Sequence, residues 1–187
     1  TIILYAKIID NLRGMIMKKM DKTKYEYMLE CNKKYMDLTA LSFGNKKITY
    51  EEMHEQIEKY VRLLYAKGVR EGDLIGVIAL NTPESVYLLY ALDIIGAITV
   101  GYSPLDNAEK VKKDIELVKP KMIISVDMCY SNFKDAEKAL NFSTILYSPL
   151  ESVNDFKIKL GYKLLQLTKG NFKLSKDNNL KNLIKKD

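Results

Sequence analysis

Few side chains in this 187-residue sequence stand in an arrangement that is typical of acid-base or nucleophilic catalysis. The single histidine, His54, stands next to Glu55 and one helical turn before Glu58, in a stretch with helical periodicity. A catalytic histidine acts on a serine or cysteine nucleophile, and the sequence places none beside it. We therefore expect His54 on the exposed face of a helix. The carboxylate pairs Glu51-Glu52 and Glu55-Glu58 are likewise expected to be solvated rather than to act as general acid and base.

Motifs for nucleotides and metals are also missing. No Gly-x-Gly-x-x-Gly and no Gly-x-x-x-x-Gly-Lys-Ser/Thr motif occurs, so the phosphate-binding loops of free-standing dinucleotide and P-loop domains are not present. Cys31 and Cys129 have no companion cysteines at metal-ligand spacing. We interpret them as two thiols of a protein in a reducing compartment, the cytoplasm. The chain itself is predicted to contain no catalytic residue, no cofactor-binding residue and no metal ligand.

The middle of the chain alternates between strand-like and helix-like segments. Four short apolar runs begin about 20 to 25 residues apart, with one helix-like segment in each gap. Strands that alternate with helices in this way form parallel sheets through right-handed crossovers. We predict an α/β fold with a parallel sheet flanked by helices, and the predicted strands are Leu74–Leu80, Ile98–Gly101, Met122–Val126 and Ser143–Tyr147.

Cap and turn residues mark the boundaries of the first long helix of this region. Thr49 and Glu52 have the spacing of a capping box, in which a hydroxyl and a carboxylate each bond an amide of the first turn. Gly68 suits the left-handed residue that ends many helices. The predicted buried stripe consists of Met53, Ile57, Tyr60, Val61 and Leu64. A hairpin is predicted before the helix, with strands Ala40–Phe43 and Lys47–Thr49.

Two further helices are predicted between the strands. Thr82 is the expected cap of the first, with Pro83 in its first turn, where the missing amide hydrogen costs nothing. This helix is apolar nearly all round, which predicts burial on most sides. The second is predicted to be capped by Asp106 with Glu109 and to end before Pro120.

The ends of the chain differ in composition from the body, and this predicts three parts. Residues 1–37 are predicted to be N-terminal helices, residues 38–150 the α/β body, and residues 151–187 an extended or partly disordered segment rich in Lys and Asn. Residues 1–20 are amphipathic, which suits a helix docked on its own domain or a helix at a membrane surface. A second helix is expected at Lys22–Tyr35.

The net charge of +6 is located at the two ends. Residues 1–20 carry +3 and residues 151–187 carry +5, so the body carries −2. A slightly acidic body argues against a surface that follows nucleic-acid phosphates. The longest apolar stretch, 88–100, is interrupted by Asp93 and Gly96 and is far shorter than the roughly 20 residues of a membrane span. We therefore expect neither nucleic-acid binding nor a transmembrane segment.

A series of short motifs follows the predicted elements in a fixed order. They are Thr49-Tyr50-x-Glu52, Gly68-Val69, Gly72-Asp73, Asn81-x-Pro83-Glu84, Gly96-Ala97 leading to Pro104, and Lys119-Pro120. With these motifs the region from about Leu41 to Asp127 resembles the N-terminal part of AMP-forming acyl-activating enzymes, which include acyl-CoA synthetases, luciferases and peptide-synthetase adenylation domains. The first motif and the segment Ile95–Pro104 are similar to two core motifs of that family, both chiefly structural.

The resemblance implies an enzyme that converts a carboxylate and ATP into an acyl-adenylate and passes the acyl group to coenzyme A. ATP, Mg²⁺ and CoA are implied for the full-length enzyme, with a small carboxylate substrate, the remainder of the chain and a homo-oligomer as expected partners. The family's loop rich in Ser, Thr and Gly that ends in Pro-Lys has no counterpart here, since Thr168-Lys169-Gly170 lacks the repeated hydroxyls. We therefore expect an inactive N-terminal fragment of such a ligase.

The motifs leave the substrate and the exact class of protein open. Gly101-Tyr102-Ser103 departs from the family's usual approach to the Pro104 loop, which leaves the substrate subclass undecided. Tyr102 and Ser103 are candidates for facing the acyl or pantetheine route, because they follow the carboxyl end of a predicted parallel strand. The alternatives are a peptide-synthetase adenylation domain and a non-catalytic flavodoxin-like binding module.

Overall fold

The computed structural model describes residues 22–149, 153, 156–168 and 179–184, and its contacts divide the chain into two units, residues 1–34 and 35–187. In the first unit, helix α2 spans Lys24–Asn32. It begins with a capping box in which the Thr23 hydroxyl accepts from the Glu26 amide at 3.1 Å and the Glu26 carboxylate accepts from the Thr23 amide at 2.7 Å. The helix predicted at Lys22–Tyr35 is therefore confirmed in shorter form. The amphipathic pattern of residues 1–20 lies outside the described residues.

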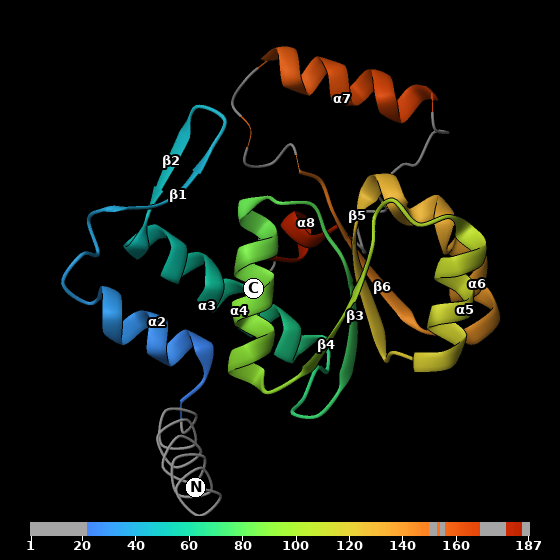
Figure 1. Cartoon of the computed structure of the whole chain (residues 1–187), viewed down its shortest axis with the longest axis horizontal. Helices are drawn as coiled ribbons and strands as arrows, with labels where there is room; N and C mark the ends of the chain where they lie inside the picture. Colours follow the sequence, from blue (N-terminus) through green and yellow to red (C-terminus); the bar gives the residue numbers. More distant parts are fainter. Residues whose placement is uncertain (1–21, 150–152, 154–155, 169–178, 185–187) are drawn as a thin grey trace, which may run out of the picture. The chain divides into compact units, whose positions relative to one another are not determined.

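The second unit is built on a parallel four-stranded sheet, as the sequence predicts (Figure 1). The strands are β3 (Leu74–Ile78), β4 (Ile98–Tyr102), β5 (Met122–Val126) and β6 (Ser143–Tyr147). Their order is β4-β3-β5-β6, with Ile75 opposite both Thr99 and Met122, and Met122 opposite Ser143. All five residues of β5 are buried, which explains why its sequence is apolar apart from Ser125 and does not alternate.

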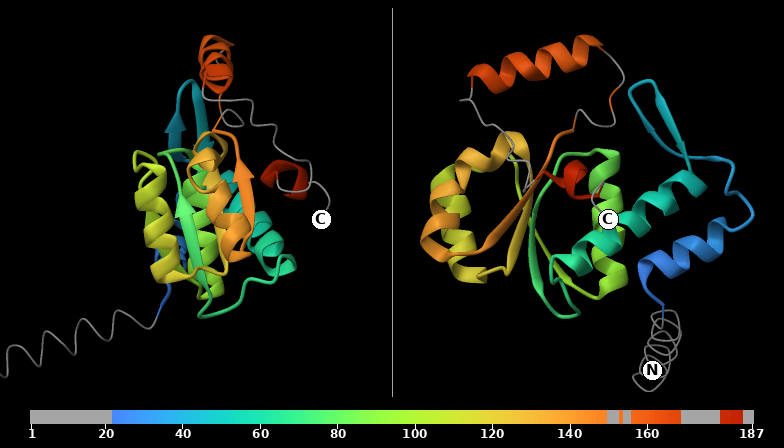
Figure 2. Two further views of the ribbon diagram at one scale, coloured as in Figure 1. Left: turned by 90° about the vertical axis from the view of Figure 1, so that its right-hand side faces the viewer. Right: turned by 180° about the vertical axis from the view of Figure 1, so that it is seen from behind.

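Helices cover both faces of this sheet (Figures 1 and 2). One face carries α3 (Tyr50–Ala66) and α4 (Pro83–Ile95), and the other carries α5 (Ala108–Val118) and α6 (Lys134–Leu140). A 3₁₀ helix, η1 (Asp127–Asn132), connects β5 to α6, and the antiparallel hairpin of β1 (Thr39–Phe43) and β2 (Lys46–Thr49) precedes α3. This is a doubly wound arrangement, because the chain leaves β3 toward one face and leaves β4 and β5 toward the other.

The caps show which local predictions were sound. The Thr49 box forms as predicted, with 2.9 Å from the Thr49 amide to the Glu52 carboxylate and 3.2 Å from the Glu52 amide to the Thr49 hydroxyl. Gly68 has the predicted left-handed backbone, with φ of +84°. The cap of α5 was assigned wrongly. Asn107 accepts from the Lys110 amide at 2.9 Å, while the Asp106 carboxylate pairs with the Lys110 ammonium at 2.6 Å. A neighbouring Asn is an equally good cap, so the sequence did not distinguish the two.

Burial in α3 and α4 departs from the prediction at single positions. In α3, Val61 is only half-buried and Leu63 takes its place in the core. In α4, Tyr87, Leu88, Ala91 and Leu92 are buried while Leu89 is 48% exposed. The helix that the sequence predicts to be buried on most sides therefore has one exposed edge among the described residues.

Residues 151–187 contain two helices, where the sequence prediction was an extended or partly disordered segment. Helix α7 spans Phe156–Thr168 and the short helix α8 spans Leu180–Ile184. In α8, Leu180 and Leu183 are buried, and this helix packs on α3 and β6. The apolar residues of α7 are spaced four apart, but they stand among lysines. The prediction treated this apolar pattern as too weak to indicate a helix. The division of the chain at residues 37 and 150 stays a prediction.

Candidate functional site

The carboxyl ends of the four parallel strands meet at one edge of the sheet, which we call the carboxyl edge. Crevices at this edge bind ligands in doubly wound folds, at the point where the strand order reverses. Here that point lies between β3 and β5, because α4 follows β3 on one face and η1 and α6 follow β5 on the other. The residues that follow these strands are therefore the first place to look for a site.

Asp127 follows β5 directly at this point and is only 2% exposed. Its carboxylate accepts a hydrogen bond from the Tyr162 hydroxyl of α7. Burial, followed by the hydrogen bond to Asp127, raises the pKa of Tyr162. The phenol therefore stays protonated and remains a donor at physiological pH. This contact connects α7 to the carboxyl edge across 35 positions of sequence.

Three further long-range hydrogen bonds join the loops of the carboxyl edge. The Leu80 amide after β3 donates to the Tyr147 hydroxyl at the end of β6, at 3.3 Å. Two bonds connect η1 to the loop after β4: Cys129 Sγ donates to the Pro104 carbonyl at 3.7 Å, and Asn132 Nδ2 donates to the Asp106 carbonyl at 3.1 Å. Tyr147 is fully buried, and burial is the main cause that raises its pKa to about 12. The edge is thus connected from β4 to β6 by side chains.

Tyr102 and Ser103, the two residues singled out from the sequence, lie at this edge but in different environments. Tyr102 is 7% exposed, and its ring lies against Gly76 of β3. Burial and, to a lesser extent, Asp114 raise the pKa of its phenol. Ser103 is exposed, and its hydroxyl accepts from the Leu105 amide at 3.2 Å. The structure therefore gives Tyr102 a packing role, and Ser103 is the member of the pair that faces solvent.

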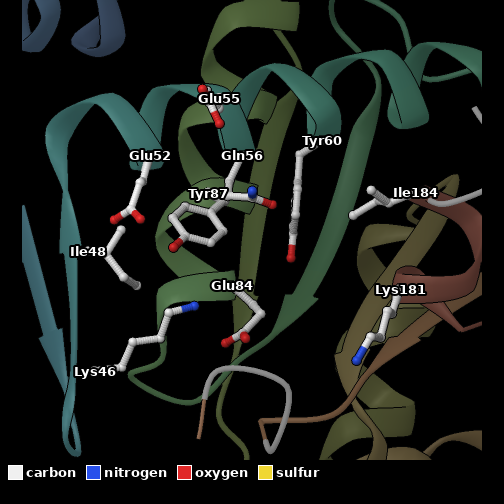
Figure 3. A pocket seen from close by; sticks show the side chains of 10 residues that line it. All are labelled: Lys46, Ile48, Glu52, Glu55, Gln56, Tyr60, Glu84, Tyr87, Lys181 and Ile184. Carbon is white, nitrogen blue, oxygen red and sulfur yellow. The ribbon is translucent and has the colours of Figure 1, made fainter. Parts of the chain in front are cut away.

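A pocket of about 350 Å³ lies next to α3 and the first turn of α4 (Figure 3). Figure 3 shows the Glu84 carboxylate between the ends of Lys46 from β2 and Lys181 from α8. Glu84 is 4% exposed and stands in the first turn of α4, where the helix dipole favours a negative charge. The rings of Tyr60 and Tyr87 meet edge to face at 5.7 Å beside it. The lining combines both signs of charge and contains no serine, cysteine or histidine.

The position of His54 corrects the prediction that it is exposed. The side chain is 6% exposed, on the buried side of α3. Burial lowers the pKa of the imidazole, and the partial opposing effect of Glu58 does not reverse this. The neighbouring Glu55 is exposed and lines the pocket instead. The prediction of exposure failed because the position of one histidine in the sequence does not reveal how the helix is rotated against its neighbours.

The described residues bring no recognisable reaction centre together. Within the described ranges, no three His, Cys, Asp or Glu side chains lie close enough to hold a metal ion. The contact between buried Asp127 and half-buried Tyr162 was missed from sequence, although a charged residue directly after a mainly apolar strand is a signal that can be recognised. The arrangement of this part of the chain positions loops at an edge of the sheet, and it does not assemble an acid, a base and a nucleophile.

The family model of AMP-binding enzymes matches residues 29–160, which include the sheet, its helices and the carboxyl edge. The chain belongs to the AMP-binding enzyme family. It is 23% identical to the long-chain-fatty-acid–CoA ligase of Bacillus subtilis over 160 residues, which is 86% of this chain and 29% of that protein. It is 32% identical to enterobactin synthase component F of Shigella flexneri over 108 residues, 56% of this chain and 8% of that protein.

The fold of this family member agrees with a solved ligase. A benzoate CoA ligase from Burkholderia xenovorans LB400 superposes with a TM-score of 0.64 at 18% identity, over 69% of this chain and 26% of that one. This likeness shows the fold. The chain spans less than a third of the length of the curated relatives named above. None of the helices in the described ranges combines the length and apolar character required to cross a membrane.

Proposed function

We propose that the protein containing this AMP-binding chain is an acid–thiol ligase, which activates a carboxylate as acyl-AMP with release of pyrophosphate and transfers the acyl group to CoA. The observation that carries this proposal is the family match over residues 29–160, which includes both the Thr49 capping box and the segment Ile95–Pro104. The similarity to a fatty-acid–CoA ligase over 86% of the chain supports CoA as the acceptor.

In this proposal, the 187 residues form a supporting part and do not carry out the reaction alone. The sequence has no Ser/Thr/Gly-rich loop ending in Pro-Lys, and helix N-termini and backbone amides are what such loops use to hold phosphates. ATP, Mg²⁺ and CoA would therefore be bound mainly by other parts of the protein. The cytoplasmic location and a homo-oligomeric state stay predictions.

A carrier protein is the second candidate acceptor of the acyl group. The 32% identity with enterobactin synthase component F over 108 residues favours it, because that identity is higher than the 23% with the fatty-acid ligase. The two candidates share the adenylation step and differ only in the thiol that takes the acyl group. An experiment that separates the two candidates therefore has to identify the thiol acceptor and not only the activation step.

The test is carboxylate-dependent exchange of labelled pyrophosphate into ATP, measured on the 187-residue chain and on the full-length protein that contains it. We expect exchange with the full-length protein and none with the chain alone. Added CoA should then yield an acyl-CoA thioester in a panel of fatty, aromatic and amino acids. Exchange without a CoA thioester, combined with acylation of a phosphopantetheine carrier, would select the second candidate. No exchange with any acid would refute both and support a non-catalytic module.

We also propose that the turn after β4 lines the acyl or pantetheine route in the full-length enzyme. Ser103 is the exposed residue of that turn, while Tyr102 supports it from the buried side. We expect Ser103→Phe to change acyl-chain preference or the KM for CoA, and Tyr102→Phe, which keeps the ring, to change neither. Pyrophosphate exchange across acids of increasing chain length measures the chain preference, and acyl-CoA formation at varied CoA concentration measures the KM for CoA. Unchanged chain preference and KM in Ser103→Phe would remove the turn from the route.

A further inference from the structure

Helix α7 presents an apolar stripe to solvent. Phe156, Leu160 and Leu164 are 75%, 48% and 56% exposed. Their spacing of four residues places them on one face of the helix, in consecutive turns. Single exposed leucines occur elsewhere, as at Leu117, but a continuous row on a helix is a different feature. Exposed apolar rows of this kind mark surfaces that bind a membrane or another protein.

The hydrogen bond from Tyr162 to Asp127 fixes the orientation of this helix. Tyr162 is two residues from Leu160 and from Leu164, so its side chain leaves the helix about 160° away from theirs. It holds the inner side of α7 on the carboxyl edge, and the apolar row therefore faces outward. The outward row is consequently not an alternative core face, because the opposite face is already attached by the part-buried hydrogen bond from Tyr162 to Asp127.

Lysines stand next to the row in the sequence of α7. The α7 sequence contains three lysines and no acidic residue, and residues 151–187 carry +5 while the body carries −2. Lys157 and Lys159 stand one residue after Phe156 and one before Leu160, with Lys157 exposed and Lys159 half-buried. Lysines beside an apolar row can keep their ammonium groups in an aqueous interface while the apolar side chains enter a lipid layer.

We propose that α7 docks on an anionic lipid surface. The row Phe156, Leu160 and Leu164 inserts into the boundary between headgroups and acyl chains, and the lysines contact the lipid phosphates. Charge complementarity favours an anionic surface over a symmetric pair of α7 helices, because that pair would bring two positive helices together, whereas an anionic surface neutralises them. The surface is distinct from the pocket of Figure 3 and does not depend on the proposed ligase activity.

The experiment uses the whole 187-residue chain with phosphatidylcholine vesicles, with and without phosphatidylglycerol. Because the sequence contains no tryptophan, Phe156→Trp adds a single reporter. We expect its emission to shift to the blue with anionic vesicles only, and Leu117→Trp, on an exposed site of α5, to show no shift. High salt should weaken binding, since it screens the lipid charge. Leu160→Glu combined with Leu164→Glu should lower the vesicle-bound fraction at sedimentation by about tenfold or more. Leu117→Glu is the matched control and should bind like the parent chain.

Several results would overturn the proposal. Equal binding of the parent chain and the Leu160→Glu/Leu164→Glu chain would place the lipid contact elsewhere, with residues 1–20 as the first candidate. Equal shifts with neutral and anionic vesicles would remove the role of the lysines. Absence of any shift, together with a dimer on light scattering that the double variant abolishes, would identify a second copy as the occupant. All the substituted positions are exposed, so thermal unfolding should be unchanged and provides the folding control.

Discussion

The two edges of the parallel sheet are held together in different ways. At the amino edge, short backbone bonds join the turns: Gly72 donates to the Gly96 carbonyl at 2.9 Å, and Lys121 donates to the Leu74 carbonyl at 2.9 Å. One partly exposed ion pair, Asp73–Lys121 at 2.6 Å, adds to them. At the carboxyl edge, by contrast, buried side chains such as Tyr147 and Asp127 make the connections.

This difference explains what each edge is able to do. The backbone hydrogen bonds of the amino edge do not depend on which side chains are present. The bonds of the carboxyl edge depend on particular side chains, so substitutions there can change both the attachment of the loops and the groups that face a ligand. In this chain the carboxyl edge is also where α7 is attached. The comparison predicts that substitutions at the carboxyl edge have larger and more distant effects than those at the amino edge.

The largest effect is expected from Gly76→Ala, beneath the carboxyl edge. A Cβ there would lie 2.8 Å from Tyr102 Cε2 and 3.0 Å from Ile123 Cγ1, both in the core. Overpacking of this kind costs about 1–3 kcal/mol. We expect the free energy of unfolding, measured by urea denaturation, to fall by that amount. Gly101→Ala is the control in the neighbouring strand, because its Cβ would meet nothing within 4 Å.

Tyr102 can be tested as the cause of that clash. Combining Gly76→Ala with Tyr102→Leu should cost less than the sum of the two single substitutions, because the aromatic ring that blocks the Cβ is gone. Strict additivity would mean that Ile123 or the backbone is the obstacle. Equal losses in Gly76→Ala and Gly101→Ala would show that the close approach of Tyr102 is not what requires a glycine.

A more local effect, of at most the same size, is expected from Tyr162→Phe. The substitution removes one donor to the buried Asp127 carboxylate, which costs about 1–3 kcal/mol at a charged buried group. The loss should act mainly on α7, because Tyr162 is its hydrogen-bonded contact with the carboxyl edge. We expect faster tryptic cleavage at Lys157 and Lys159. Cleavage at Lys112 and Lys113 in α5 serves as the internal control and should not change. Uniformly faster cleavage at all four sites would indicate global unfolding instead.

The sequence predicted the parts of the fold that depend on local chemistry. The capping box at Thr49, the left-handed Gly68 and the four strands are each determined within a few residues, so their signals are readable. The strand order β4-β3-β5-β6 and the burial of His54 depend on packing between distant segments. Neither the strand order nor the burial of His54 leaves a pattern in one stretch of sequence. The burial of His54 is decided by how α3 is oriented against its neighbours.

The candidate site was predictable only in its location. Tyr102 ends β4 and Ser103 follows it at the carboxyl edge, but the sequence did not show which of the two side chains is exposed, and their role in a site stays a prediction. The contact between Asp127 and Tyr162 joins residues 35 positions apart, and no sequence motif between them predicts it. Long-range side-chain pairs of this kind require the tertiary structure, whereas the turns of the amino edge do not.

The smallest effect is expected from Asp73→Asn at the amino edge. The hydrogen bond from Lys121 is the main cause that lowers the pKa of Asp73, and the exposed fractions of 22% and 46% limit its value to less than about 1 kcal/mol. Because the folded-state pKa is below the unfolded value of 3.8, the stabilisation is complete above that value and disappears as the pH falls through the folded-state pKa. Asn keeps an oxygen for the Arg70 amide, so only the charge is lost. Urea denaturation of both chains should show a small difference at pH 7 that decreases as the pH falls below 3.8 and in high salt. A difference as large as that of Tyr162→Phe would contradict the distinction between the two edges.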